Sequence, residues 1–279
     1  MTDALSNIHS HRILVVDDHP VNQMVLTAML AELDFSSDTA ISGIEAVRMA
    51  DRCDYDLIFM DIQMPGMDGY ETTEQIRKIP AHSTTPVIAM TASTIDNQLI
   101  KRCESNMNQL IGKPYEHDTL KKLLTHWLEL SSEPVLPVRL NQPLKQTAEP
   151  ATGEFSCLDS AALDQLRDTF AGTDKASLIE LIEVFLETLT KLHLQLKQNI
   201  LDRDIQAVRQ TAHALKSCSG NIAALRYMSI SSDIEQIAIS TGSAQIDAIT
   251  KPWTELENEY DKLLPELKQL ISLLQSEPP

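Results

Sequence analysis

The sequence places acidic side chains directly after two short apolar runs. Asp17 and Asp18 follow Arg12–Val16, and Asp61 ends the run that begins at Leu57. Continuous apolar runs of this length are typical of strands buried on both faces of a parallel sheet. Ligands bind at the carboxyl ends of the strands in open α/β sheets. Asp61 is therefore the candidate reactive residue.

Two further polar residues close apolar runs later in the chain. Thr91 follows Pro86 to Met90, and Lys113 comes shortly after Asn108 to Ile111. The carboxyl ends of parallel strands meet at one edge, so all five side chains should converge there. Three carboxylates placed so close repel one another unless a cation joins them, and oxygen ligands with open positions suit Mg²⁺.

This arrangement fits the transfer of a phosphoryl group. An aspartate beside Mg²⁺ can attack phosphorus and form an acyl phosphate. Lys113 would neutralise one phosphoryl oxygen, and the Thr91 hydroxyl would donate a hydrogen bond to another. Each residue alone has an ordinary structural explanation, such as a helix cap or a surface lysine. Their joint position after successive strands favours the functional interpretation.

The elements that would position these residues alternate regularly. Strands are predicted at 12–16, 35–40, 57–60, 86–90 and 108–111, and helices at 20–33, 43–50, 70–79, 96–105 and 116–130. Five alternations of strand and helix predict a parallel sheet that is covered on both faces.

The character of the chain then changes. Prolines recur at 134, 137, 143 and 150 without apolar periodicity, which predicts a linker. After it only helical periodicity remains, with helices predicted at 158–170, 174–200, 205–219, 225–240 and 244–274, the last broken near Pro252. Long amphipathic helices joined by short turns predict a helical bundle.

The third helix of this bundle carries His213, with Lys216 one turn further on the same face. A phosphoryl-accepting imidazole should be neutral and exposed to solvent, and a nearby cation would offset the charge that it receives. A histidine on a helix more often has no such role, and His193 is interpreted in that way. His19, beside the acidic pair, is expected to be exposed.

Composition excludes several classes of protein. The formal net charge of −17 disfavours binding to nucleic acid. No apolar run approaches the roughly 18 residues that a membrane helix needs, and no signal peptide is evident. Four scattered cysteines predict reduced thiols, with neither a zinc site nor a disulfide framework. We therefore expect a cytoplasmic protein without a membrane or nucleic-acid partner.

Residues 10–130 resemble the receiver domain of two-component response regulators. The matching residues are Ile13 to Asp18, Asp61 with Met64 to Gly69, Thr91-Ala92, and Lys113-Pro114. The resemblance implies a flavodoxin-like, doubly wound, five-stranded parallel sheet of strand order 2-1-3-4-5.

The same resemblance assigns roles to individual residues. It implies Asp61 as the phosphoacceptor, with Thr91 and Lys113 assisting. It also implies direct Mg²⁺ ligation by Asp18, Asp61 and the Gln63 carbonyl, with Asp17 helping through water, and a cis Lys113–Pro114 peptide. Leu110 stands where the family commonly has an aromatic switch residue, so the sequence does not support an aromatic switch.

Residues 157–275, after the linker 131–156, resemble a histidine-containing phosphotransfer (HPt) domain, which is a four-helix bundle. The resemblance rests on His213-x-x-Lys216, with Ser217 in place of a common glycine. It implies His213 as a second phosphoacceptor, assisted by Lys216.

Together these resemblances predict a phosphorelay protein. Its partners would be a sensor histidine kinase and the receiver domain of a downstream response regulator. Two alternatives stay open: a phosphate sink, and a detached tail of a hybrid histidine kinase. A kinase activity is not expected because the chain lacks glycine-rich ATP-binding loops, and a DNA-binding regulator is not expected because no basic recognition helix follows.

Overall fold

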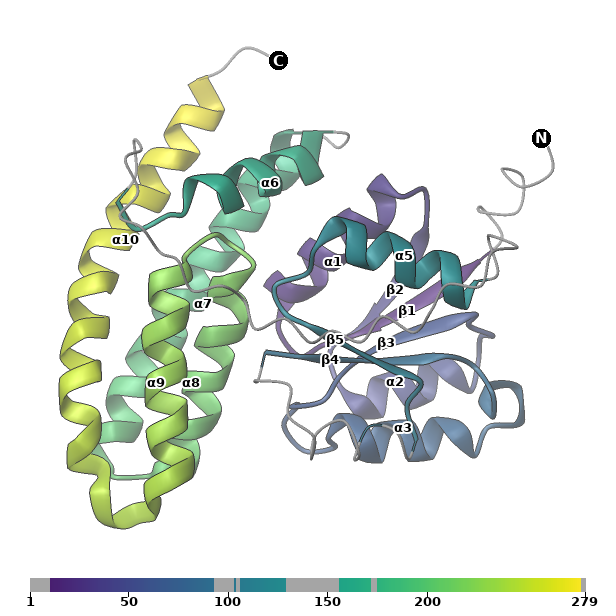
Figure 1. Ribbon diagram of the computed structural model, residues 1–279, viewed down its shortest axis with the longest axis horizontal. Helices are drawn as coiled ribbons and strands as arrows, with labels where there is room; N and C mark the ends of the chain where they lie inside the picture. The colour runs from purple at the N-terminus through teal and green to yellow at the C-terminus, as the bar shows by residue number, and fades with distance from the viewer. Residues whose placement is uncertain (1–10, 93–102, 104–105, 129–155, 172–174, 277–279) are drawn as a thin grey trace. The chain divides into compact units, whose positions relative to one another are not determined.

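The computed structural model describes residues 11–92, 103, 106–128, 156–171 and 175–276 (Figure 1). The chain divides into two compact units, Met1–Lys145 and Gln146–Pro279. The predicted helix at 96–105 lies almost entirely outside the described residues, as does the predicted linker at 131–156.

The first unit is an α/β sandwich. Its strands are β1 (Arg12–Val16), β2 (Ser36–Ala40), β3 (Leu57–Asp61), β4 (Val87–Thr91) and β5 (Gln109–Gly112). Its helices are α1 (Pro20–Glu32), α2 (Gly43–Ala50), α3 (Gly69–Arg77) and α5 (His117–Trp127), with a 3₁₀ turn, η2, at Pro80–His82. The elements that the sequence predicted in the described part are therefore present, with ends that differ by a few residues.

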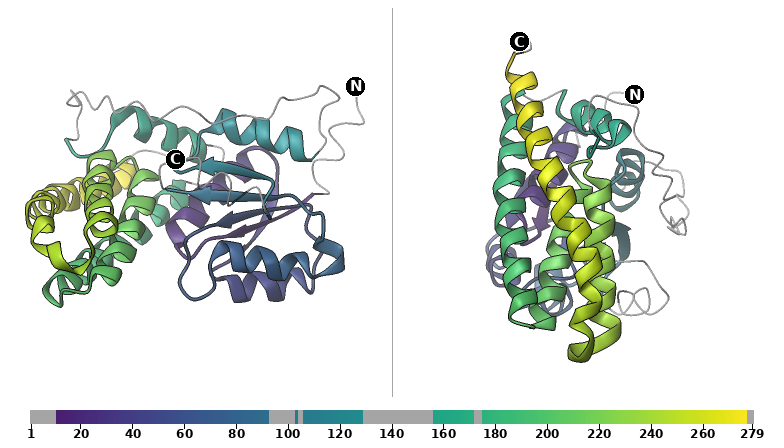
Figure 2. Two further views of the ribbon diagram at one scale, coloured as in Figure 1. Left: turned by 60° about the horizontal axis from the view of Figure 1, so that its bottom comes forward. Right: turned by 90° about the vertical axis from the view of Figure 1, so that its left-hand side faces the viewer.

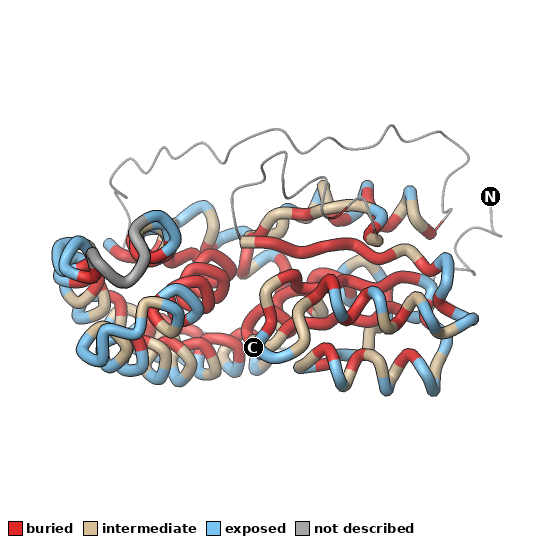
Figure 3. The backbone as a smooth tube through the Cα atoms, turned by 90° about the horizontal axis from the view of Figure 1, so that it is seen from below, coloured by how far each residue is buried: buried red, intermediate tan, exposed pale blue. Residues whose placement is uncertain are grey.

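All five strands are parallel and follow the order β2-β1-β3-β4-β5. Helices α1 and α5 cover one face of the sheet, and α2 and α3 cover the other (Figures 1 and 2). Every residue of β3 and β4 is buried, because helices lie on both sides (Figure 3). The predicted doubly wound sheet and its strand order are confirmed.

The second unit is helical. It contains α6 (Ser160–Ala171), α7 (Lys175–Leu201), α8 (Ile205–Gly220), α9 (Leu225–Thr241), a 3₁₀ segment η3 (Gly242–Ile249) and α10 (Thr250–Ser276). Helix α7 packs on α8, α8 on α9, α9 on α10 and α10 on α7, which closes a four-helix bundle, while α6 packs on α7. The bundle is therefore the predicted one.

The last helix differs from its prediction. Residues 244–249 belong to η3, and α10 begins at Thr250, so Pro252 lies in its first turn and does not break a longer helix. Proline is tolerated there because the first backbone N–H groups of a helix have no partner within it.

Among the described residues, no helix is both long and apolar enough to cross a membrane.

Candidate functional site

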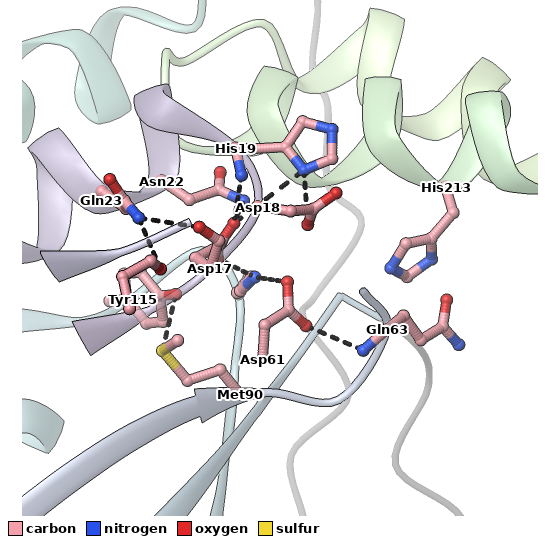
Figure 4. Close-up of polar contacts among 12 residues, drawn as sticks. Asp17, Asp18, His19, Asn22, Gln23, Asp61, Gln63, Met90, Tyr115 and His213 are labelled. Carbon is pink, nitrogen blue, oxygen red and sulfur yellow. Dashed lines mark hydrogen bonds and ion pairs between the residues drawn. The ribbon is translucent and has the colours of Figure 1, made fainter. Parts of the chain in front are cut away.

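The structure brings the predicted acids together at the carboxyl edge of the first unit's sheet (Figure 4), and the predicted lysine joins them there. Asp17 follows β1, Asp61 ends β3, and Lys113 follows β5. The Lys113 Nζ lies 2.6 Å from Asp17 Oδ2 and 2.7 Å from Asp61 Oδ2. One ammonium group therefore bridges two carboxylates that are far apart in the sequence.

The two carboxylates and the ammonium group are all buried, so their mutual attraction is screened by little water. Asp17, Asp61 and Lys113 are 0%, 2% and 6% exposed. Desolvation alone would lower the pKa of Lys113, but attraction to Asp17 and Asp61 outweighs it and raises that pKa well above the usual value. Desolvation likewise opposes the charged form of Asp17, yet Lys113 holds the pKa of its carboxyl below the usual range. Both shifts favour the charged forms of Lys113 and Asp17.

Thr91 lies at the same edge. It is the last residue of β4, is 3% exposed, and pairs with Gly112 of β5 in the sheet register. Its carbonyl accepts a hydrogen bond of 2.7 Å from the Lys113 backbone N–H. Thr91 is thereby fixed to the loop that carries the lysine.

Asp18 is the more accessible acid of the pair, since 16% of its side chain is exposed. His19 Nδ1 lies 3.0 Å from Asp18 Oδ1. The expectation that His19 is exposed is wrong, because only 15% of its side chain is accessible. Desolvation opposes its charged form, but the hydrogen bond to Asp18 raises its pKa overall. The imidazole is drawn to the two carboxylates and away from solvent.

The residues present fit a hard divalent cation. Asp17, Asp18 and His19 each offer a ligand atom, and these atoms lie within 4.8 Å of one another. The Gln63 backbone N–H donates to Asp61 Oδ1 at 3.2 Å, which places this loop beside the acid. Carboxylate and carbonyl oxygens with remaining open positions are the ligands that Mg²⁺ prefers.

The loop after β3 depends on a glycine. The Gly69 N–H donates to the Ile62 carbonyl at 3.0 Å, and a Cβ on Gly69 would lie 2.2 Å from the Asp61 carbonyl oxygen. Asp68 caps α3 by accepting a hydrogen bond of 2.8 Å from the Glu71 N–H. Helix α3 therefore begins directly against the backbone of Asp61.

The peptide between Lys113 and Pro114 is cis, as the family resemblance implied. Leu110 is partly buried and packs against the hydrophobic core, as an aliphatic side chain at this position should. Tyr115, two residues after the lysine, donates a hydrogen bond of 3.2 Å from its hydroxyl to Met90 Sδ.

The second site lies on α8 and α9. His213 Nδ1 is 2.7 Å from Glu235 Oε1, and Lys216 Nζ is 3.0 Å from Glu235 Oε2. Burial opposes the charged form of Glu235, but the hydrogen bond to His213 and the charge of Lys216 lower the pKa of its carboxyl overall. Glu235 therefore ties both predicted residues to one buried carboxylate.

This contact defines the chemistry of the imidazole. A carboxylate only accepts hydrogen bonds, so Nδ1 carries the proton of this contact, and in the neutral ring the lone pair is on Nε2. The prediction of an exposed imidazole is wrong, since His213 is 7% exposed and Glu235 holds the ring against α9. Among the described contacts, none occupies Nε2.

His193 is also not a surface residue. It is 5% exposed, stacks on Tyr260 with ring centroids 4.0 Å apart, and lies 2.8 Å from the Tyr227 hydroxyl through Nδ1. Desolvation lowers its pKa to about 4. The helical period places His193 on the inner face of α7, but the sequence interpretation did not predict its burial because histidine is a polar residue.

Sequence reasoning missed three residues of these sites. Asn22 and Gln23 contact Asp17 from α1, and they looked like polar positions on an amphipathic helix. Glu235 gave no signal in the sequence, because a single acid between Ile234 and Ile237 is expected to face solvent, whereas the structure buries its side chain.

Each of the two units matches a known protein family. Residues 13–125 match the response regulator receiver domain, and residues 180–277 match the Hpt domain. The chain therefore carries a response regulator receiver domain followed by an Hpt domain.

Several sensor kinases are similar in sequence. The signal transduction histidine-protein kinase BarA of Escherichia coli K12 is 27% identical over 93% of this chain. The sensor histidine kinase RcsC of the same organism is 36% identical over 45% of the chain. The sensor protein GacS of Pseudomonas syringae pv. syringae is 32% identical over 48%. The chain spans only 27%, 13% and 15% of the lengths of these relatives.

A solved receiver domain is also similar. It belongs to the sensor histidine kinase PA1611 of Pseudomonas aeruginosa PAO1 and has a magnesium ion coordinated in its active-site cleft. It is 38% identical, with a TM-score of 0.40, and covers 43% of this chain and 98% of that domain.

Proposed function

We propose that Asp61 accepts a phosphoryl group from the phosphohistidine of a sensor kinase, and that His213 passes phosphoryl to or from a receiver aspartate. The observation that carries this proposal is the ammonium group of Lys113 held 2.7 Å from Asp61 Oδ2. A cation fixed at this oxygen can follow the charge of an incoming phosphoryl group without reorganisation.

The transfer needs little covalent machinery. An Asp61 carboxylate oxygen forms the new O–P bond while the P–N bond to the donor imidazole breaks, and the electron pair returns to that nitrogen. Lys113 donates to one phosphoryl oxygen, and the Thr91 hydroxyl donates to another. Burial of these donors strengthens their effect, because little water screens them.

Asp18, Asp61 and the Gln63 carbonyl would hold Mg²⁺, with Asp17 acting through water. When bound, Mg²⁺ supplies positive charge that neutralises phosphoryl oxygens. Asp18 suits direct ligation, since its carboxylate is partly exposed and the structure gives it a contact with His19 alone among the described residues.

At the second site, Glu235 orients the imidazole and keeps its proton on Nδ1. The lone pair on Nε2 is then the nucleophile that forms the N–P bond as the O–P bond of the phosphoaspartate breaks. Lys216, bound 3.0 Å from the same carboxylate, offsets the negative charge that arrives. Transfer from Asp61 to His213 and onward is one route that this arrangement supports.

The substitution Asp61→Asn tests the first acceptor. It should abolish phosphoryl uptake from a kinase, because the amide is not a nucleophile, while His213 still accepts phosphoryl from another phosphorylated receiver. The measurement is radiolabel transfer from purified kinases and receivers to the full chain. Normal labelling of Asp61→Asn by a kinase would disprove the assignment of Asp61.

The substitution His213→Gln tests the second acceptor. It should leave labelling of Asp61 intact and block delivery of phosphoryl to a downstream regulator. The same time course measures both steps. Unchanged delivery would remove the helical unit from the relay.

Two alternatives to onward signalling fit the same sites. In a phosphate sink, His213 would drain a kinase and activate no regulator, so the regulator would stay unlabelled in that time course. In the tail of a hybrid histidine kinase, the donor would be a kinase domain on the same protein. Neither case changes the acceptors, and we expect both steps to take place in the cytoplasm without nucleic acid or membrane.

We also propose the domain limits 10–130, 131–156 and 157–275. A clamp on the start of the helical unit supports the third: Glu266 of α10 accepts hydrogen bonds from the backbone N–H groups of Ser156 and Cys157 at 2.8 and 2.9 Å. The domain would therefore begin well before the family match at residue 180.

A further inference from the structure

Asn22 and Gln23, near the start of α1, are both buried against Asp17 (Figure 4). The Asn22 amide nitrogen lies 3.0 Å from Asp17 Oδ1 and 3.2 Å from Oδ2. The Gln23 amide nitrogen instead donates to the main-chain carbonyls of Asp17 and Ala40, at 2.8 and 2.9 Å. One amide holds the side chain of Asp17, and the other holds its backbone.

The hydrogen-bonding capacity of the Asp17 carboxylate is fully used. Oδ1 accepts from the His19 backbone N–H at 2.9 Å and from Asn22, and Oδ2 accepts from Asn22 and from Lys113. A carboxylate has about four lone-pair sites, so two contacts on each oxygen occupy them. Asp17 is also completely buried. A cation could ligate Asp17 directly only by displacing one of these donors.

The neighbouring acid is in the opposite situation. Asp18 has 16% of its side chain exposed, and its described contact is the one to His19. Two adjacent carboxylates thus differ because Asn22 and Lys113 occupy one of them. Lys113 is already assigned to the phosphoryl group, and the remaining side-chain donor that contacts both oxygens of Asp17 is Asn22.

We infer that Asn22 is a positioning residue that keeps Asp17 out of direct coordination of the cation and reserves it for Lys113. This inference rests on the proposed Mg²⁺ site. Without the Asn22 amide, each oxygen of Asp17 regains a lone pair beside Asp18 and Asp61. Mg²⁺ then gains a further direct ligand, and Lys113 loses its fixed anchor.

The test is Mg²⁺ binding to the full-length chain by isothermal titration calorimetry, with Mg²⁺ alone as the probe. Asn22→Leu should tighten Mg²⁺ binding by about fivefold, since coupled neighbouring groups typically interact on this scale. Asn22→Ser, whose hydroxyl is too short to reach both oxygens, should shift binding in the same direction and replaces the leucine variant if that one does not fold.

Gln23→Met is the matched control. It removes two buried hydrogen bonds from the same turn of α1, so it should lower the melting temperature to a similar extent, yet leave the Mg²⁺ affinity within about 1.5-fold of wild type. The double variant Asn22→Leu with Asp17→Asn should bind Mg²⁺ like Asp17→Asn alone, because Asn22 acts through that carboxylate.

The outcomes separate clearly. Unchanged or weaker Mg²⁺ binding by both Asn22 variants overturns the inference, as does an equal effect of Gln23→Met or a full effect of Asn22→Leu in the Asp17→Asn background. In these cases the wild-type chain still binds Mg²⁺ and the proposed phosphoacceptors stand. Absence of Mg²⁺ binding by the wild-type chain overturns the inference and the proposed metal site, while the labelling tests judge Asp61 and His213 independently.

Discussion

At the scale of single residues, both candidate sites use one device: a buried carboxylate that holds a lysine. Asp61 and Asp17 hold Lys113, and Glu235 holds Lys216. A buried ion pair is costly to desolvate and is weak evidence for stability. At these positions the ion pair keeps a cation fixed beside each proposed phosphoryl acceptor, which is a functional reason to bury it.

Glu235 can be tested without a change in shape. Glu235→Gln should slow phosphoryl transfer to His213 roughly tenfold or more, because a neutral amide no longer fixes the Nδ1 proton or offsets charge on the ring. The rate from a phosphorylated receiver and the imidazole tautomer by ¹⁵N NMR are the measurements.

Glu257→Gln is the matched control, since Glu257 binds Lys197 at 3.0 Å on the surface of the same unit. That change should leave the transfer rate as it is in wild type. A Glu235→Gln variant with the wild-type rate and tautomer would show that Glu235 has only a structural role.

At the scale of elements, the carboxyl ends of the strands position the residues of the first site. The first turn of α3 packs closely against that edge of the sheet. Helix α3 begins at Gly69 against the Asp61 backbone, so the proposed phosphoacceptor lies between the end of a strand and the first turn of a helix. Where the backbone approaches this closely, a side chain has no room.

Two glycines in this loop are needed for different reasons: Gly69 for lack of space, and Gly66 for its backbone conformation. Gly69→Ala should cost about 1–3 kcal/mol of stability and slow phosphoryl uptake, because its Cβ would overlap the Asp61 carbonyl. Gly66→Ala meets no atom within 4 Å, but its φ of 81° disfavours a side chain, so about 1 kcal/mol should be lost with uptake retained. Thermal unfolding and radiolabel uptake measure both, and equal uptake by the two variants would contradict the argument.

At the scale of the whole molecule, the two units should respond differently to acid. His193 in the second unit has a pKa of about 4, below the ordinary 6.5. Between these values the unfolded chain binds the proton more readily than the folded one. The contribution of neutral His193 to the free energy of unfolding is therefore fully present above pH 6.5 and is lost as the pH drops toward 4. The loss for the helical unit should be about 2 kcal/mol.

Hydrogen exchange of the full chain at pH 7 and pH 5 checks this, with rates corrected for intrinsic exchange. Protection of α7 and α10 should fall, because His193 stacks between Tyr260 and Trp253 of α10. His193→Phe keeps an aromatic ring and should remove the dependence over this range. The same loss of protection in His193→Phe would assign the effect to other groups.

The sequence by itself determined the order of elements and one of the two sites almost completely. Strands buried on both faces must be apolar along their length, and the residue that follows such a strand lies at the sheet edge, so Asp17, Asp61, Thr91 and Lys113 could be placed together from spacing alone. The helical period likewise defined the bundle, and the His213–Lys216 pair follows from one turn of helix.

Only the tertiary structure decided which partners those residues have. Hydrogen bonds between side chains depend on helix rotation and rotamers, which no local pattern encodes, so the roles of Asn22 and Glu235 and the burial of His19, His193 and His213 did not follow from the sequence. A polar residue on a helix looks the same in sequence whether it faces water or a buried charge. The packing of α1 against β1 and of α9 against α8 settles that difference, and with it how Asp17 and His213 are held.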